Sequence, residues 1–179
     1  MSQYEMLAAG FGGQGVMMLG KLFAEAGVFE GNYATFLPSY GPAMRGGTAN
    51  CSVVVSTEAI ASPILPKPKV IVVMNNPSFL AFEKMVAPGG LLLVNSSLVK
   101  EKSSRTDIKV IYIPGNEIAE KEGMARAANI VMLGVFAAET KAVKPESLKS
   151  AIEHTLGESK KQYLPINLKI LEAGLNFKP

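Results

Sequence analysis

The sequence predicts an α/β fold: a three-layer sandwich with a mixed, mostly parallel central sheet and a helical C-terminal third. Short apolar stretches alternate with helix-like stretches along most of the chain, as in a sheet covered by helices. Residues 50–56 instead alternate in period two, with the odd-numbered residues on one face and the even-numbered residues on the other. That pattern is typical of a strand with one drier side and indicates a mixed sheet.

The first half of the chain begins with an apolar stretch, residues 4–9, which predicts a strand. Residues 14–30 are predicted to form a helix, because apolar residues recur there at helical spacing and Gly31 follows as a helix end. Residues 33–37 are predicted to be extended. The sequence PSYGPAMRGGT, residues 38–48, is expected to be an irregular loop before the strand at 50–56.

The second half continues the alternation. Residues 70–74 are uniformly apolar, which predicts a buried strand, and residues 77–86 are predicted to be a helix with Pro77 in its first turn. A Pro-Gly-Gly turn leads to strands at residues 91–94 and 108–113. The remaining elements are predicted helices at residues 124–140, 145–156 and 165–173.

Composition and charge predict one globular domain, residues 1–179. The chain is 48% hydrophobic and 18% charged, and a chain of 179 residues can bury a substantial core. The net charge of +3 is small, and no basic cluster interleaved with aromatic residues is present, so we expect no nucleic-acid partner. The first ten residues lack the pattern of a signal peptide, and the longest apolar run, residues 130–138, is shorter than the about 20 residues that span a bilayer. We expect a cytoplasmic protein without membrane contact.

The sequence GFGGQG, residues 10–15, matches the G-x-G-x-x-G turn of dinucleotide-binding, Rossmann-like folds. Glycines permit the tight turn and the close approach of another group, and the N–H groups that open the helix suit an anion such as phosphate. Classical NAD binding also needs an acidic residue at the end of the second strand, but no Asp or Glu lies between Gly31 and Glu58. The turn is therefore expected to serve as a backbone platform and anion contact. A ligand-free turn remains the alternative.

Metal and redox centres are not expected on this chain. Cys51 is the only cysteine and His154 the only histidine, so neither an iron–sulfur cluster with four cysteine ligands nor a His/Cys zinc site can be assembled. Cys51 is predicted to be a small core residue. The loop at 38–48 is a better candidate for binding, because Gly and Pro surround Arg45, whose planar guanidinium suits a phosphate or carboxylate. An ordinary surface loop remains possible there.

Four blocks, GFGGQGVMMLGKLFAEAG, LPSYGPAMRGGTANCSVVVS, VMNNPS and APGGLLLVNSS, resemble the gamma subunit of 2-oxoacid:ferredoxin oxidoreductases, most closely the 2-oxoglutarate type (2-oxoglutarate synthase). The resemblance covers residues 4–97, with a weaker similarity in RAANIVMLGVF. It implies an enzyme that oxidatively decarboxylates a 2-oxoacid on thiamine diphosphate, passes electrons through iron–sulfur clusters to ferredoxin and releases an acyl-CoA. It also implies that alpha, beta and ferredoxin-like subunits hold the thiamine diphosphate and the clusters.

By this resemblance the chain holds no catalytic residue and no cofactor alone; it supports assembly and accommodates coenzyme A. Where many relatives carry Glu this chain has Ala43, so any salt link made by that Glu is in doubt. A homodimer of the isolated chain is a further expectation. The residues implied in cofactor binding or subunit contact are Gly10, Gly12, Gly13, Gln14, Gly15, Ser39, Tyr40, Gly41, Pro42, Arg45, Gly46, Gly47, Asn75 and Asn76.

Two other functions remain open at this stage. The glycine turn is compatible with a stand-alone NAD(P)- or flavin-dependent Rossmann-like oxidoreductase. The chain is also compatible with a pure assembly module that contacts no cofactor.

Overall fold

The computed structural model describes residues 2–41 and 47–179, and its centre is a six-stranded sheet in the order β2-β3-β1-β4-β5-β6. The strands are β1 (Gln3–Phe11), β2 (Tyr33–Tyr40), β3 (Thr48–Ser56), β4 (Val70–Val73), β5 (Leu91–Asn95) and β6 (Lys109–Ile113). Strand β3 is antiparallel to both of its neighbours, whereas β1 pairs with β4, β4 with β5 and β5 with β6 in parallel. The prediction of a mixed, mostly parallel sheet is confirmed.

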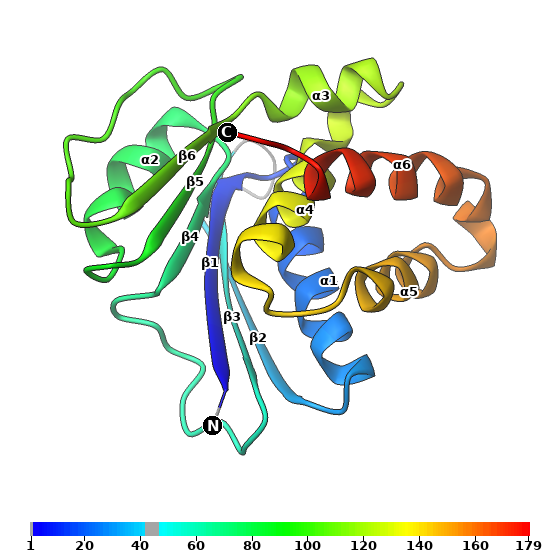
Figure 1. The fold of residues 1–179 in the computed structure, drawn as a ribbon, viewed down its shortest axis with the longest axis horizontal. Coiled ribbons are helices and arrows are strands. Elements are labelled where there is room, and N and C mark those ends of the chain that lie inside the picture. Colours follow the sequence, from blue (N-terminus) through cyan, green and yellow to red (C-terminus); the bar gives the residue numbers. More distant parts are fainter. Residues whose placement is uncertain (1, 42–46) are drawn as a thin grey trace.

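Helices cover both faces of this sheet. They are α1 (Val16–Phe29), α2 (Asn76–Phe82), α3 (Gly115–Lys121), α4 (Ala128–Thr140), α5 (Pro145–Leu156) and α6 (Leu164–Leu175), with 3-10 turns η1 (Glu83–Met85), η2 (Ala125–Ala127) and η3 (Glu158–Tyr163). Figure 1 shows α2 on one side of the sheet and α1, α4, α5 and α6 on the other, which gives the three layers. The chain after β6 is helical, as predicted for the C-terminal third.

Two hydrophobic cores lie on the two faces of the sheet. The larger core joins α1 and α4 to the sheet, and its centre contains Phe23 and Phe136, whose rings meet edge-on with centroids 4.7 Å apart. The smaller core places Phe79 and Val86 against Ile71 and neighbouring strand residues. Because the sheet is buried from both sides, its central strands are apolar on both faces.

Helix α4 is buried along nearly its whole length because α6 covers the side that faces away from the sheet. Two glycines permit this close approach. A β-carbon on Gly174 would lie 2.3 Å from the backbone oxygen of Val131, and one on Gly134 would lie 2.6 Å from the backbone oxygen of Leu171. Neither position can carry a side chain unless the two helices separate.

The structure corrects four details of the predicted elements. The helix predicted at residues 77–86 is divided, because α2 ends at Phe82 and residues 83–85 form the 3-10 turn η1. Strand β2 continues to Tyr40 instead of ending at residue 37, because its ladder with β3 extends to the pair Tyr40–Ala49. Helix α3 was not predicted, since seven residues are too few to show helical periodicity. Helix α4 begins at Ala128 instead of residue 124, because residues 125–127 form the 3-10 turn η2.

Two features, a membrane-spanning helix and a cluster of metal ligands, are absent from the described residues. None of the helices formed by residues 2–41 and 47–179 combines the length and the apolar character that crossing a membrane requires. Within the same residues, His, Cys, Asp and Glu side chains form no group of three or more that is placed to bind a metal ion.

Candidate functional site

The candidate site lies where the carboxyl ends of β1, β4 and β5 meet at one edge of the sheet. These strands are parallel and adjacent, so the segments that follow them emerge side by side. The glycine turn, residues 10–15, follows from β1, Asn75 comes shortly after β4, and Asn95 is the last residue of β5. The fold therefore brings together residues that are up to 85 positions apart in the sequence, from Gly10 to Asn95.

The glycines of the turn have different physical roles. A β-carbon on Gly10 would lie 2.7 Å from the side chains of Gln14 and Val16, and one on Gly15 would lie 2.5 Å from the amide of Asn129. Gly15 also has a φ of 72° and Gly13 a φ of 102°, in the region that favours glycine. A β-carbon on Gly13, however, would meet no described atom within 4 Å. Gly10 and Gly15 thus allow internal packing, whereas Gly13 turns the chain at a position that no described atom crowds.

Gln14 fixes the turn to the neighbouring helix. Its Oε1 accepts a hydrogen bond from the backbone N–H of Phe11 and another from Nδ2 of Asn75, each 2.7 Å long. The Oδ1 of the same Asn75 accepts from the backbone N–H of Ser78 at 2.9 Å and so caps α2. Both polar ends of this buried asparagine are satisfied, and the glycine turn is attached to the first turn of α2.

Asn76 takes a different direction from Asn75. Its Oδ1 accepts from the backbone N–H groups of Lys100 at 3.2 Å and Glu101 at 3.4 Å, and its Nδ2 donates to the Glu101 carboxylate at 3.3 Å. Of the two predicted asparagines, only Asn75 contacts the glycine turn; Asn76 holds the loop after β5.

The second predicted loop meets the glycine turn at its described ends. Ser39 and Tyr40 are the last residues of β2, and the N–H of Gly41 donates to the Thr48 oxygen at 2.7 Å. The N–H of Gly12 donates to the oxygen of Gly47 at 3.0 Å, which joins the two loops directly. The other residues predicted for this loop lie outside the described residues: Pro42, Ala43, Arg45 and Gly46.

Two buried asparagines at this edge were missed from the sequence. Asn95 is fully buried; its Oδ1 accepts from the N–H of Gly115 at 3.2 Å and its Nδ2 donates to Oδ1 of Asn116 at 2.9 Å. Asn129 donates from Nδ2 to the backbone oxygen of Gly15 at 3.2 Å. The sequence signal that could have found them was an asparagine bordering an apolar run. Such an asparagine is buried with the run, and its amide then needs hydrogen-bond partners from another segment.

The only ionisable group near this edge with a shifted pKa is Glu117, within the part of the chain that the structure describes. A hydrogen bond from the hydroxyl of Ser97 lowers the pKa of this exposed carboxyl below its usual range. The side chains that join the strand ends, Gln14, Asn75, Asn95 and Asn129, are neutral amides. They hold backbone in place and bind polar groups, but they do not transfer protons at ordinary pH.

Cys51 lies apart from this edge, in the larger core. Its Sγ is 3.5 Å from the Val16 backbone oxygen, and burial raises the pKa of the thiol to about 12. The thiolate is the nucleophilic and metal-binding form of cysteine, so this thiol is unreactive in the folded chain. The prediction that Cys51 is a core residue is confirmed.

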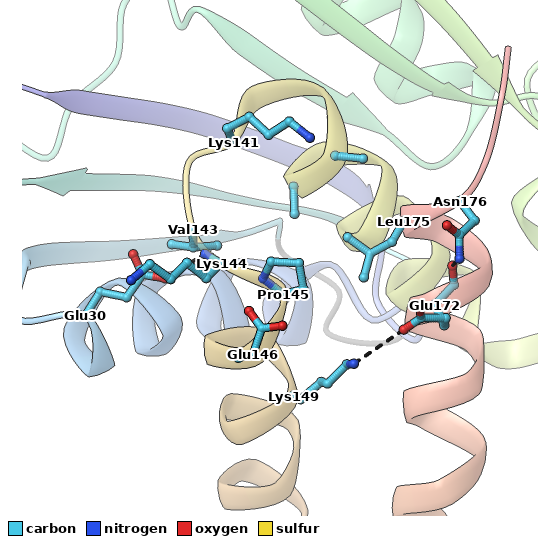
Figure 2. Close-up of a pocket in the computed structure, with 12 residues that line it drawn as sticks. Glu30, Lys141, Val143, Lys144, Pro145, Glu146, Lys149, Glu172, Leu175 and Asn176 are labelled. Carbon is cyan, nitrogen blue, oxygen red and sulfur yellow. Dashed lines mark hydrogen bonds and ion pairs between the residues drawn. The ribbon is translucent and has the colours of Figure 1, made fainter.

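A surface hollow of about 520 Å³ lies at the C-terminal ends of α1 and α4, whereas the glycine turn precedes the N-terminus of α1 (Figure 2). Three of its charged side chains have partners: Lys149 lies 3.4 Å from Glu172, and the carboxylate of Glu30 accepts from the backbone N–H of Lys144 at 2.6 Å. Acidic and basic residues are balanced around it, so it does not present the net charge that an ionic ligand would need.

Comparison with known proteins shows consistent similarities. Residues 5–177 match the family model described as pyruvate ferredoxin/flavodoxin oxidoreductase. The chain is 42% identical over 170 residues to ketoisovalerate oxidoreductase subunit VorA of Methanothermobacter thermautotrophicus; the match covers 94% of this chain but only 35% of VorA. It is 34% identical over 151 residues to 2-oxoglutarate synthase subunit KorC of Methanocaldococcus jannaschii, covering 83% of this chain and 81% of KorC. The chain thus spans about a third of the length of VorA and most of the length of KorC.

Solved structures share the fold. The keto/oxoacid ferredoxin oxidoreductase gamma subunit from Geobacter sulfurreducens superposes with a TM-score of 0.81 at 27% identity, covering 96% of this chain and 95% of that one. A 2-oxoglutarate:ferredoxin oxidoreductase from Magnetococcus marinus, with 2-oxoglutarate, coenzyme A and succinyl-CoA bound, superposes with a TM-score of 0.88. At 19% identity, and with 98% of this chain covering 31% of that one, the second similarity concerns the fold alone.

Proposed function

The chain belongs to the pyruvate ferredoxin/flavodoxin oxidoreductase family, and from this premise we propose that it is the gamma subunit of a multi-subunit 2-oxoacid:ferredoxin oxidoreductase. The observation that carries the proposal is the match of residues 5–177 to the family model, together with relatives of similar length such as KorC. The proposed enzyme oxidatively decarboxylates a 2-oxoacid, transfers the electrons to ferredoxin and releases an acyl-CoA.

Within that enzyme we assign residues 1–179 to one gamma domain that supports assembly and accommodates coenzyme A. The glycine turn supports this assignment, since no described atom crowds a β-carbon on Gly13 and the turn leads directly into the N-terminus of α1, where backbone N–H groups favour an anion. A phosphate or carboxylate of coenzyme A, or of a partner subunit, is the kind of group that such a turn and Arg45 would bind. The neutral amides around the turn favour binding over bond cleavage.

Thiamine diphosphate and the iron–sulfur clusters are assigned to the alpha, beta and ferredoxin-like subunits. Thiamine diphosphate supplies the carbanion-stabilising chemistry of decarboxylation when bound to its own subunits. The chain offers one cysteine, buried in the larger core, which does not fit the thiolate ligand set of a cluster.

The substrate is proposed to be a 2-oxoacid, with two candidates. The sequence blocks around the two loops favour 2-oxoglutarate. The second candidate is ketoisovalerate, which is favoured by the higher identity of the chain to the VorA subunit, 42% against 34% for KorC. Ferredoxin reduction and acyl-CoA formation, measured with 2-oxoglutarate, ketoisovalerate and pyruvate on the purified complex, distinguish them.

The test of the function is reconstitution. The chain, expressed with the alpha, beta and ferredoxin-like subunits from the same source, is expected to co-purify as a stoichiometric complex that makes acyl-CoA. The chain alone is expected to be inactive with every 2-oxoacid and a viologen dye. A stand-alone oxidoreductase would be stabilised by roughly 2.7 kcal/mol when its cofactor is present at ~100 times the dissociation constant of that cofactor. If NADH, NADPH or FMN stabilised the isolated chain in this way, the stand-alone oxidoreductase would replace this proposal.

A further inference from the structure

Strand β2 is the outermost strand of the sheet, and no group in residues 2–41 and 47–179 bonds to its outward backbone groups. The bond from the Gly41 N–H to the Thr48 oxygen continues the β2–β3 ladder and sets its alternation. Odd-numbered residues of β2 therefore bond to β3, and even-numbered residues direct their N–H and C=O groups outward. Ala34, Phe36 and Tyr40 each present a donor and an acceptor there, whereas Pro38 presents only its oxygen.

The outward side of β2 borders α1, which lies to the right of the sheet in Figure 1. The two elements expose side chains that soluble proteins usually bury: 55% of Val28, 48% of Phe29 and 37% of Phe36. Between them lies a hollow of about 330 Å³, which is also lined by Lys21, Ala24, Glu25, Ala34 and His154. We call this hollow, with Val28, Phe29 and Phe36, the edge hollow.

A strand added to β2 would run beside the edge hollow. In a strand paired with β2, alternate side chains project to the same face as Ala34 and Phe36. That face is the one covered by α1, because the Phe36 ring lies close to Gly20 of the helix. The side chains of such a strand that lie beside Ala34 and Phe36 on this face therefore pass over the edge hollow.

The lengths of the relatives indicate which part of the enzyme this domain must contact. The same domain is about a third of the VorA polypeptide and about four fifths of the KorC polypeptide; we call the subunit that corresponds to the rest of VorA the larger subunit. Where the domain is a separate chain, no peptide linker holds it to the rest of its enzyme, so its contact surface must do so. Permanent contacts of that kind are typically large and apolar.

We propose that an extended segment of the enzyme's larger subunit adds to β2 as a further strand and places an apolar side chain in the edge hollow. This inference rests on the proposed function, since it takes the partner from it. A second copy of this chain is a poorer occupant. In a symmetric β2–β2 pairing Pro38 removes a donor from both copies, and an edge proline is a device by which proteins prevent such self-pairing.

Hydrogen exchange on the reconstituted complex tests the strand addition directly. The amides of Ala34, Phe36 and Tyr40 are expected to exchange at least tenfold more slowly in the complex than in the free chain. The amides of Thr35 and Leu37, already bonded to β3, are expected to change much less. Equal protection of both sets, or no added protection in an active complex, would overturn the strand addition while leaving the proposed function intact.

A photo-crosslinking residue at position 29 tests the partner. Crosslinks are expected to the larger subunit, and the same residue at position 80, where Leu80 is 62% exposed on α2 across the sheet, serves as the control. Crosslinks from position 29 to a second copy of the chain would overturn the assignment. If no complex formed with those subunits at all, the proposed function itself would fail.

Paired substitutions separate docking from folding. Ala34→Pro removes an outward N–H and no ladder bond to β3, so it is expected to weaken assembly at least tenfold; because Ala34 also packs against the larger core, we expect the melting temperature of the free chain to fall, but less than in Thr35→Pro. Thr35→Pro removes a ladder bond to β3 and should lower that melting temperature. Phe29→Asp should weaken assembly at least tenfold and Leu80→Asp should not; equal effects of the two Asp variants would contradict the proposal.

Discussion

The side chain of Asn75 donates a hydrogen bond 2.7 Å long to Oε1 of Gln14, across 61 positions of sequence. This bond joins the segment after β1 to the segment after β4, and Gln14 accepts a second bond from the N–H of Phe11. The glycine turn is therefore held from two sides before any partner or ligand arrives. A prearranged turn reduces the ordering entropy that binding would otherwise cost.

Gln14→Ala is expected to destabilise the chain by about 1–3 kcal/mol, because Asn75 and the N–H of Phe11 both lose their acceptor in a partly buried place. Gln14→Glu is the matched control. Since Oε1 acts only as an acceptor in these two bonds, a carboxylate oxygen can replace it, and this variant should lose less stability than the Ala variant. Urea unfolding of both variants measures the difference, and equal losses would show that the two bonds do not hold the turn.

Gly15→Ala is expected to destabilise the chain more than Gly13→Ala. Both residues have positive φ, which costs of order 1–3 kcal/mol for a residue with a side chain. Only Gly15 adds a collision, because its β-carbon would lie 2.5 Å from the Asn129 amide.

Gly13→Val is expected to lower the melting temperature of the free chain, because a residue with a side chain is strained at the φ of 102° found here. No described atom lies within 4 Å of the added β-carbon. We therefore expect any effect on coenzyme A binding or assembly beyond this strain to come from a partner, a ligand or a group outside the described residues. Melting temperature of the free chain and the KM for coenzyme A of the complex separate the two effects.

Gly174→Ala is expected to destabilise the chain by about 1–3 kcal/mol, the range of an overpacked core. The new β-carbon would lie 2.3 Å from the Val131 backbone oxygen, which cannot rotate away as a side chain can. Glu172→Ala, two residues earlier, is the control; it removes only the exposed pair with Lys149, which contributes at most about 1 kcal/mol. A similar loss for both variants in urea unfolding would contradict the close helix crossing.

Much of this fold could be predicted from local patterns, since buried strands and amphipathic helices leave period-two and period-3.6 signals. Strand β2 shows where that approach fails. Pro38 interrupts the local signal, but at an edge its missing N–H faces outward, so the ladder continues past it. The glycine turn and Asn75 could be placed at one sheet edge from the parallel topology. The pairings of Asn95 and Asn129 could not, because they depend on which distant backbone groups are left unpaired after packing.

Arg45→Ala is expected to leave the melting temperature of the free chain nearly unchanged, since exposed arginines contribute little to stability. In the complex we expect a loss of about 2–5 kcal/mol, as a higher KM for coenzyme A or as weaker assembly, if the guanidinium meets an anion in a partly buried contact. Arg45→Lys keeps the charge but not the planar fork and should give an intermediate loss. Normal assembly and normal coenzyme A kinetics in Arg45→Ala would exclude the role.

The last prediction concerns the buried thiol of Cys51, whose pKa is raised from 9.0 to about 12 by burial. Below pH 9 the thiol keeps its proton in both the folded and the unfolded chain, so it adds no pH dependence. Between pH 9 and pH 12 the unfolded chain releases this proton and the folded chain retains it. The free energy of unfolding therefore falls by up to about 1.4 kcal/mol per pH unit in this window because of Cys51 alone.

Cys51→Ala removes that contribution together with the sulfur's packing. At pH 8 the variant is expected to be less stable than the natural chain, because a small cavity replaces the Sγ atom. The gap should narrow by roughly 2 kcal/mol between pH 8 and pH 10.5, since only the natural chain carries the penalty of the buried thiol. Val53→Ala provides the control: Val53 is also fully buried in the same core but does not titrate, so its gap to the natural chain should stay constant. Urea unfolding of the three chains at both pH values, under reducing conditions, decides the matter, and a Cys51→Ala gap as constant as that of Val53→Ala would mean that the folded thiol ionises at its ordinary pKa.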